Sequence, residues 1–133
     1  MALNFALPVR VYYQDTDAGG VVFHSSYIDF MERARSEWLR SLGFTNAGLM
    51  KEHRVFFVVR ALEITYFRPA VLDDLLDVGV EIEKTGRSLM VFRQDVKRGE
   101  DVLVSARVSL VCAATDTFKP VSVPHAIRSK LEN

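Results

Sequence analysis

One long amphipathic segment in an otherwise β-rich sequence limits the folds open to this chain. Between residues 26 and 43, apolar side chains recur at steps of three and four, which places them on one face of a helix. They are Tyr27, Phe30, Met31, Ala34, Trp38 and Leu42. Ser26, followed three residues later by Asp29, resembles a capping box, and Gly43 supplies a helix stop. We therefore predict one long helix from about Ser26 to Gly43.

The sequence beyond this helix is typical of β-strands. Residues 77–84, DVGVEIEK, alternate apolar and polar side chains, as expected for a strand with one buried and one exposed face. Three more strands are predicted at 60–67, 88–96 and 101–113, and an earlier one at 9–13, VRVYY. The segments KTGRS and KRGED contain glycine and predict hairpin turns between the later strands.

This order of a strand, a long helix and four strands predicts an α+β fold. The helix would lie across the apolar face of a single five-stranded antiparallel sheet. A length of 133 residues, 49% of them hydrophobic, fits one domain over residues 1–133. One helix would leave the sheet's edges or its second face exposed, so we expect at least a dimer.

Charge and composition narrow the class of function. The 17 basic and 17 acidic side chains balance, so no general attraction to nucleic acid or an anionic membrane is expected. The single cysteine, Cys112, excludes an internal disulfide and a cysteine-rich zinc site, and its apolar neighbours predict an inert core thiol. The N-terminal residues do not have the pattern of a signal peptide. No apolar run approaches the roughly 18 residues needed to cross a membrane. We expect a cytoplasmic protein that binds a small molecule or another protein.

The joint between the first strand and the helix, YYQDTDAGGVVFHSSY, holds more acids and glycines than a plain turn needs. Gly19 and Gly20 let the backbone approach a ligand closely, and the first amides of a helix point outward unpaired. Across from such amides, Asp17 could act on an acyl carbon as general base or nucleophile while the amides stabilise the oxyanion. The alternative is that Asp15, Thr16 and Asp17 only cap a turn.

The aromatic and histidine side chains nearby allow two interpretations. His24 could orient water or substrate, or it could simply hydrogen-bond at the helix start. Tyr13 is equally typical of packing at a strand end. Tyr27, Phe30 and Trp38 could line an acyl pocket, although such a stripe usually belongs to the core. No calcium loop, dinucleotide, Walker or serine-elbow motif is complete, and no metal site is indicated.

The stretch YYQDTDAGGVVFHSSYIDFMERARSEWLR closely resembles the opening of the hotdog-fold acyl-CoA thioesterases of the 4-hydroxybenzoyl-CoA thioesterase group, specifically the YbgC-like branch associated with the Tol-Pal system. The similarity continues through FFVVRALEITYFRPAVLDDLLDV and GRSLMVFRQDV to VSLVCAATDTFKPVSVP, nearly the whole chain. The resemblance implies a hotdog fold, in which the sheet wraps a long central helix and edge strands pair into a homodimer or homotetramer. It also implies hydrolysis of acyl-CoA thioesters to free acid and CoA, with no cofactor beyond the CoA of the substrate.

The resemblance assigns roles to individual residues. Asp17 looks like the catalytic carboxylate, His24 and Tyr13 complete the site, and the backbone amide of residue 24 would polarise the thioester carbonyl. The substrate-binding residues that it implies are Gly20, Val58, Val59, Arg87 and Ser88. The arginine and serine of the TGRS turn would contact pantetheine or phosphates, either within one chain or across a subunit interface, and the two valines would face the pantetheine arm.

Two alternatives stay open at this point. Asp17 could activate water or could attack the carbonyl itself. The chain could instead be an interaction module that binds acyl carrier protein or lipid-synthesis enzymes, with little turnover. The chain differs from the family pattern at Phe23, where tyrosine is common, and at Ser26, where asparagine is common. These differences affect the expected substrate, whereas the aspartate and the two glycines of the pattern are present.

Overall fold

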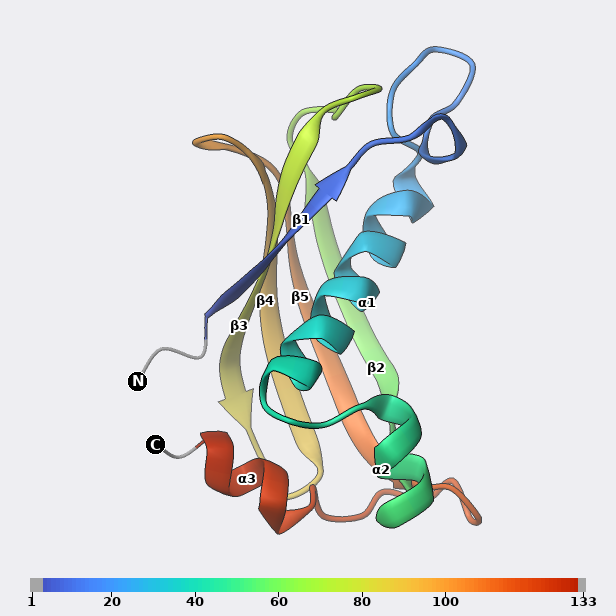
Figure 1. The fold of residues 1–133 in the computed structure, drawn as a ribbon, viewed down its shortest axis with the longest axis vertical. Coiled ribbons are helices and arrows are strands. Elements are labelled where there is room, and N and C mark those ends of the chain that lie inside the picture. The colour runs from blue at the N-terminus through green and yellow to red at the C-terminus, as the bar shows by residue number, and fades with distance from the viewer. Residues whose placement is uncertain (1–3, 132–133) are drawn as a thin grey trace.

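The computed structural model describes residues 4–131 and confirms the predicted α+β architecture. Five strands form one antiparallel sheet in the order β1-β3-β4-β5-β2, and helix α1 lies across one of its faces (Figure 1). The strands are β1 (Phe5–Arg10), β2 (Val55–Tyr66), β3 (Leu75–Thr85), β4 (Leu89–Arg98) and β5 (Asp101–Ala114). The helices are α1 (His24–Ser41), α2 (Asn46–Glu52) and α3 (His125–Leu131), and a short 3-10 turn spans Tyr13–Asp15.

Helix α1 packs on the sheet through the stripe that the sequence predicts. Its buried residues are Ser26, Tyr27, Phe30, Met31, Ala34, Trp38 and Leu39. The Trp38 ring meets Phe92 of β4 edge to face, with 5.2 Å between ring centroids. Helices α2 and α3 lie near the C-terminal end of α1 (Figure 1) and contribute buried Leu49 and Ile127 to the same core. The helix therefore covers the apolar face along the length of the sheet.

The opposite face of the sheet carries charged side chains. Arg107 of β5 donates to Glu83 of β3 at 2.6 Å, which links strands on either side of β4. The alternation predicted for residues 77–84 is confirmed, because Val78 and Val80 are buried while Glu81 and Glu83 are exposed. This face is polar, so the unpaired parts of the sheet are its two edge strands, β1 and β2.

The first strand lies earlier in the chain than the prediction of 9–13. It occupies Phe5–Arg10, and Val11 still pairs with the segment before β3 through Val11 N and Asp74 O at 2.9 Å. The chain then turns away because the carboxylate of Asp15 accepts a hydrogen bond from Tyr12 N at 2.8 Å. The β-branched and aromatic residues of VRVYY therefore predicted a strand up to Tyr13, whereas the hydrogen bond from Tyr12 N to the Asp15 side chain accompanies a turn at this point.

The helix boundaries also differ from the prediction. Helix α1 begins at His24, two residues before Ser26, and Ser26 lies buried inside its first turn and so forms no capping box. Strand β2 begins at Val55, five residues before the predicted start at residue 60. The short helices α2 and α3 were not predicted. For α2 a sequence signal was present, because Thr45 is a typical N-cap residue and its side chain accepts a hydrogen bond from Gly48 N at 2.9 Å.

Candidate active site

Asp15 fixes the path of the chain between β1 and α1. Its side chain is 7% exposed and accepts from Tyr12 N, while its carbonyl accepts from Phe23 N at 2.9 Å. These two bonds tie the strand exit to the residue before the helix. For Asp15, the turn-capping interpretation is therefore confirmed.

Asp17 is in a different environment, because it is exposed. Its Oδ1 accepts a hydrogen bond from Gly19 N at 2.8 Å, an Asx-type turn. Gly20 closes the turn by donating to Asp17 O at 3.0 Å, with a φ of +81° that glycine adopts without strain. Among the described residues, no donor bonds Asp17 Oδ2. One carboxylate oxygen is thus held in place and the other is available to a substrate or a water molecule.

The start of α1 has no side-chain cap. Phe23 occupies the N-cap position and offers no hydrogen-bonding side chain to the first turn. Within residues 4–131, neither His24 N nor Ser25 N has an acceptor, whereas Ser26 N donates to Phe23 O at 3.0 Å. Free N–H groups at the positive end of an 18-residue helix favour a negatively charged oxygen. The helix start therefore provides two backbone donors suited to an oxyanion.

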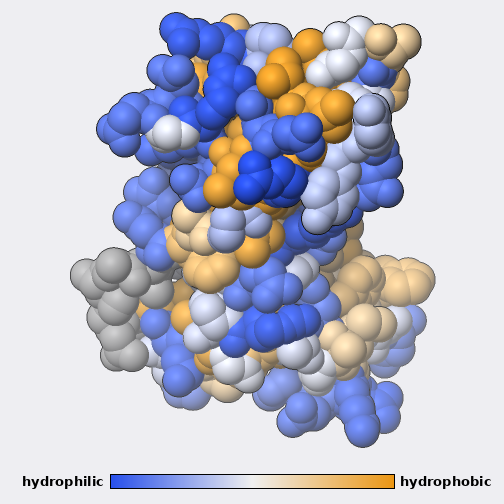
Figure 2. Space-filling view, turned by 45° about the horizontal axis from the view of Figure 1, so that its top comes forward, coloured by the Kyte–Doolittle hydropathy of each residue, from blue (hydrophilic) through white to orange (hydrophobic). Residues whose placement is uncertain are grey.

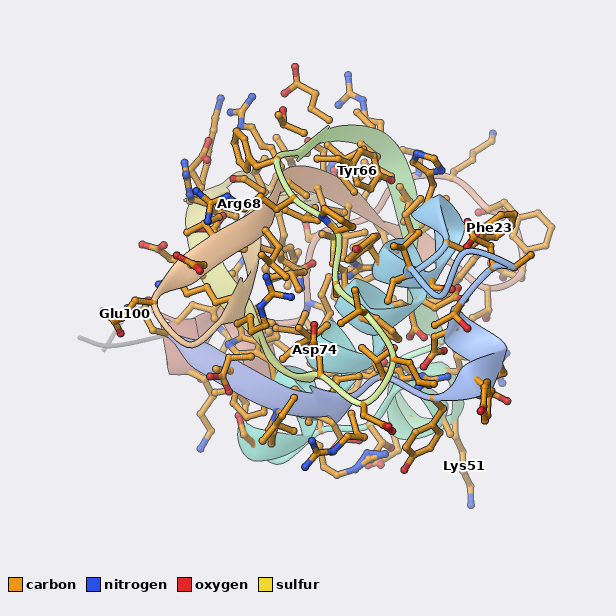
Figure 3. All side chains as sticks on the ribbon, turned by 90° about the horizontal axis from the view of Figure 1, so that it is seen from above. Phe23, Lys51, Tyr66, Arg68, Asp74 and Glu100 are labelled. Atoms are coloured by element: carbon orange, nitrogen blue, oxygen red, sulfur yellow. The ribbon has the colours of Figure 1, made fainter. Side chains whose placement is uncertain are left out.

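Asp17 and this helix start line the same cavity, of about 270 Å³. Its lining residues are Asp17, Val21, Val22, Phe23, His24, Tyr27, Tyr66, Phe67, Arg68 and Pro69. Figure 3 looks onto this end of the molecule and shows Phe23 and Tyr66 near the start of α1. Figure 2 shows apolar surface interrupted by hydrophilic groups over the same end. A carboxylate, free amides and an apolar wall thus converge on one site.

Tyr66, at the end of β2, positions the His24 side chain beside the cavity. The two rings meet edge to face with 5.0 Å between centroids, and Tyr66 Oη donates to His24 O at 3.1 Å. Burial raises the pKa of Tyr66, which keeps its phenol protonated as a donor. Tyr66 is not among the site residues that the sequence predicts. The sequence signal that could have identified it is its position at the end of a predicted strand, directly before turn residues.

The remaining predicted site residues lie elsewhere in the protomer. Tyr13 is 81% exposed and does not line the cavity. Val58 and Val59 lie on β2, where Val59 lines a second cavity. Arg87 and Ser88 follow β3, whose other end is the one next to the Asp17 turn (Figure 1). Within one chain, only Asp17, Gly20 and His24 of the predicted set come together.

Cys112 is buried, and its burial raises the pKa of the thiol to about 11. At pH 8, about one such thiol in a thousand is ionised, so we expect the native protein to be inert to Ellman's reagent. Unfolding in guanidinium should release one equivalent of reactive thiol. Rapid reaction of the native protein would contradict this expectation, and it would also disturb any assay that counts released CoA.

None of the helices within residues 4–131 is both long and apolar enough to cross a membrane. In the same part of the chain, no three histidine, cysteine, aspartate or glutamate side chains gather in a way that could hold a metal ion.

Comparison with known proteins identifies the family. The family model described as "Thioesterase superfamily" matches residues 19–105, more than half of the chain. The chain belongs to the thioesterase superfamily. The matched region begins at Gly19, two residues after Asp17, contains all of α1 and extends into β5. The predicted family is therefore confirmed.

Individual relatives of this thioesterase-superfamily protein extend the match to most of the chain. It is 44% identical over 126 residues to "Acyl-CoA thioesterase YbgC" of Haemophilus influenzae, covering 95% of this chain and 93% of the relative. It is 47% identical over 124 residues to "Acyl-CoA thioester hydrolase YbgC" of Escherichia coli, covering 92% of each. The predicted resemblance to the YbgC-like branch is thus confirmed.

Solved structures support the fold. A probable thioesterase from Bartonella henselae superposes with a TM-score of 0.87 at 38% identity, covering 91% of this chain and 99% of that one. A 1,4-dihydroxy-2-naphthoyl-CoA thioesterase from Synechocystis gives a TM-score of 0.90 at 22% identity, covering 98% of this chain and 96% of that one, a likeness of fold alone. The predicted hotdog arrangement of helix and sheet is confirmed for this thioesterase-superfamily protein.

Proposed function

We propose that this protein hydrolyses acyl-CoA thioesters to a free acid and CoA, with Asp17 as its catalytic carboxylate. The observation that carries the proposal is that Asp17 lines the same cavity as the uncapped start of α1. Acyl transfer needs both a base or nucleophile and a donor for the carbonyl oxygen. The relatives named as acyl-CoA thioester hydrolases, at 44% and 47% identity, support the substrate class.

The reaction follows from the arrangement of these groups. The thioester carbonyl oxygen is placed at the N–H of His24 and Ser25, which stabilise the negative charge of the tetrahedral intermediate. Asp17 Oδ2 either takes a proton from the attacking water or itself attacks the carbonyl carbon. In both cases the tetrahedral intermediate collapses with cleavage of the C–S bond, and CoA leaves as a thiolate that takes up a proton. The first route gives the free acid directly; in the second, a water molecule hydrolyses the resulting anhydride, which releases the acid and restores the Asp17 carboxylate. The His24 ring, held by Tyr66, lies where it can orient water or substrate.

A thiol-release assay over a chain-length series of acyl-CoA substrates tests this proposal. The wild-type protein should release CoA from at least one length, with saturation kinetics. If no acyl-CoA of any length is cleaved, the hydrolase proposal fails, and the interaction module that binds acyl carrier protein or lipid-synthesis enzymes becomes the better interpretation. A cytoplasmic location and the need for no added cofactor are part of the same proposal.

We also propose that the protein forms a dimer through β2, and that two such dimers can pair as a tetramer. Strand β2 is an edge of the sheet, and Val58 and Val59 on it are 42% and 50% exposed. A long apolar edge strand favours pairing with a second strand. An antiparallel partner would bring the far end of its own sheet, with the partner's Arg87 and Ser88, toward the Asp17 cavity.

A single charged residue in the first half of β2 should separate the subunits. We expect Val58→Lys to shift the molar mass measured by light scattering toward that of one chain, because lysine on an edge opposes strand pairing. Ala6→Lys, on the exposed side of the other edge strand β1, is the matched control and should leave the mass unchanged. A wild-type protein with the mass of one chain would refute the dimer.

A further inference from the structure

A second cavity lies under the C-terminal half of α1 and shares no lining residue with the Asp17 cavity. It has a volume of about 260 Å³ and is bounded by α1, α2 and the apolar face of the sheet. Nine of its thirteen lining residues are apolar, and six of these are buried: Trp38, Leu39, Met90, Phe92, Leu110 and Ile127. Such a cavity suits the hydrocarbon part of a small ligand.

Two charged side chains line this cavity. Glu32 is exposed, whereas the guanidinium of Arg35 is half-buried. Its Nη1 donates to Gln94 Oε1 at 2.9 Å. Gln94 is 0% exposed, and its Nε2 donates to Met31 O and Gly79 O, each at 3.1 Å. Every polar atom of the glutamine side chain is therefore engaged, and the glutamine fixes the arginine at the cavity wall.

Arg35 has no ion-pair partner among the described residues. None of their carboxylates lies within 4.0 Å of its guanidinium, and burial lowers the pKa of Arg35. Glu32, one turn earlier, opposes that lowering, but its Oε2 accepts from Ser36 Oγ at 2.7 Å at the exposed rim. A partly buried charge without a partner is costly, and within residues 4–131 only one of the five donors of this guanidinium forms a hydrogen bond.

We propose that this cavity binds a small apolar carboxylic acid, with the carboxylate on Arg35 and the hydrocarbon against Trp38 and Phe92. A planar guanidinium with free donors matches a carboxylate. The volume of about 260 Å³ lies near the lower end of the range of about 300–1,000 Å³ that is typical of small-molecule sites, which suits a medium-chain acid such as octanoate. The proposal concerns binding alone, and its connection to catalysis rests on the proposed function, whose product is a carboxylic acid.

Calorimetric titration of the whole protein with octanoate and with octanamide tests the charge directly. The two ligands share the hydrocarbon chain and differ in the head group. We expect octanoate to bind the wild type at least tenfold more tightly than octanamide. Equal affinities, or no binding of octanoate, would overturn the proposal, and this comparison needs no variant.

Two variants then locate the site. Arg35→Gln removes the charge and should reduce octanoate affinity at least tenfold, so that octanoate and octanamide bind alike. Arg33→Gln removes an exposed arginine from the same helix and should bind octanoate as the wild type does. Unchanged octanoate binding to folded Arg35→Gln protein would contradict the assignment to Arg35.

Kinetics separate the two sources of such a carboxylate. If the occupant is the free product acid, added octanoate should inhibit the wild type and not Arg35→Gln. If it is the distal carboxylate of a dicarboxylic acyl-CoA, Arg35→Gln should lower kcat/KM for suberoyl-CoA more than for octanoyl-CoA. Octanoate binding is measured without any thioester. The binding proposal can therefore be tested even if the protein hydrolyses no acyl-CoA.

Discussion

Replacing Asp17 with asparagine is expected to lower kcat for acyl-CoA hydrolysis by a factor of about 10² to 10⁴. The amide keeps an oxygen that can accept from Gly19 N, so the turn at residues 17–20 should persist. It can neither accept a proton from water nor attack as a carboxylate. Thiol release from the preferred acyl-CoA, measured under saturating substrate, gives the change in kcat.

The control for this variant is Asp116→Asn, which changes an exposed aspartate in the loop after β5. It should retain wild-type kcat. Melting temperatures of both variants should match the wild type, because neither carboxylate is buried. A folded Asp17→Asn protein with more than about a tenth of wild-type kcat would show that another group performs the chemistry.

Replacing His24 with proline is expected to lower kcat by a factor of about 10² to 10³, the effect of removing one oxyanion donor. Proline lacks the N–H that we assign to the thioester oxygen. His24 is the first residue of α1, a position where proline fits a helix. Phe23 before it has φ −67° and ψ 145°, the extended conformation that a residue before proline requires. The helix should therefore form normally.

His24→Ala separates the backbone from the ring. Alanine keeps the N–H and removes the imidazole with its edge contact to Tyr66. If the amide is the oxyanion donor, the proline variant should be at least tenfold slower than the alanine variant. Equal rates in two proteins of similar melting temperature would contradict the role of the helix start, and a large loss in His24→Ala alone would assign the function to the ring.

Patterns within single segments predicted the main elements of the fold. The stripe from Tyr27 to Trp38 marked α1 because the helical period places these residues on one face. The alternation in residues 77–84 marked β3, and the glycine turns marked the hairpins on either side of β4. Each of these signals depends on neighbouring residues alone, so no knowledge of the tertiary fold was needed.

Features that depend on contacts between distant segments were not predictable in the same way. Asp15 and Asp17 are alike in sequence, and only hydrogen bonds to Tyr12 and Phe23 make Asp15 the structural one. The pair formed by Arg35 and Gln94 joins two elements 59 residues apart. The only sequence signal for this pair was that Gln94 is a polar residue among the alternating buried residues of β4. Its role as a partner of Arg35 can be recognised only when α1 is known to pack on that face of the sheet.

The most direct measurement is a crystal structure of the wild-type protein with a hydrolysis-resistant acyl-CoA analogue in which a methylene group separates the carbonyl from sulfur. We predict that the carbonyl oxygen lies about 2.7–3.1 Å from the N–H donors at the start of α1. The carbonyl carbon should lie within about 3–3.5 Å of Asp17 Oδ2 or of a water molecule bonded to it. A carbonyl bound away from α1, with Asp17 facing solvent, would contradict the account.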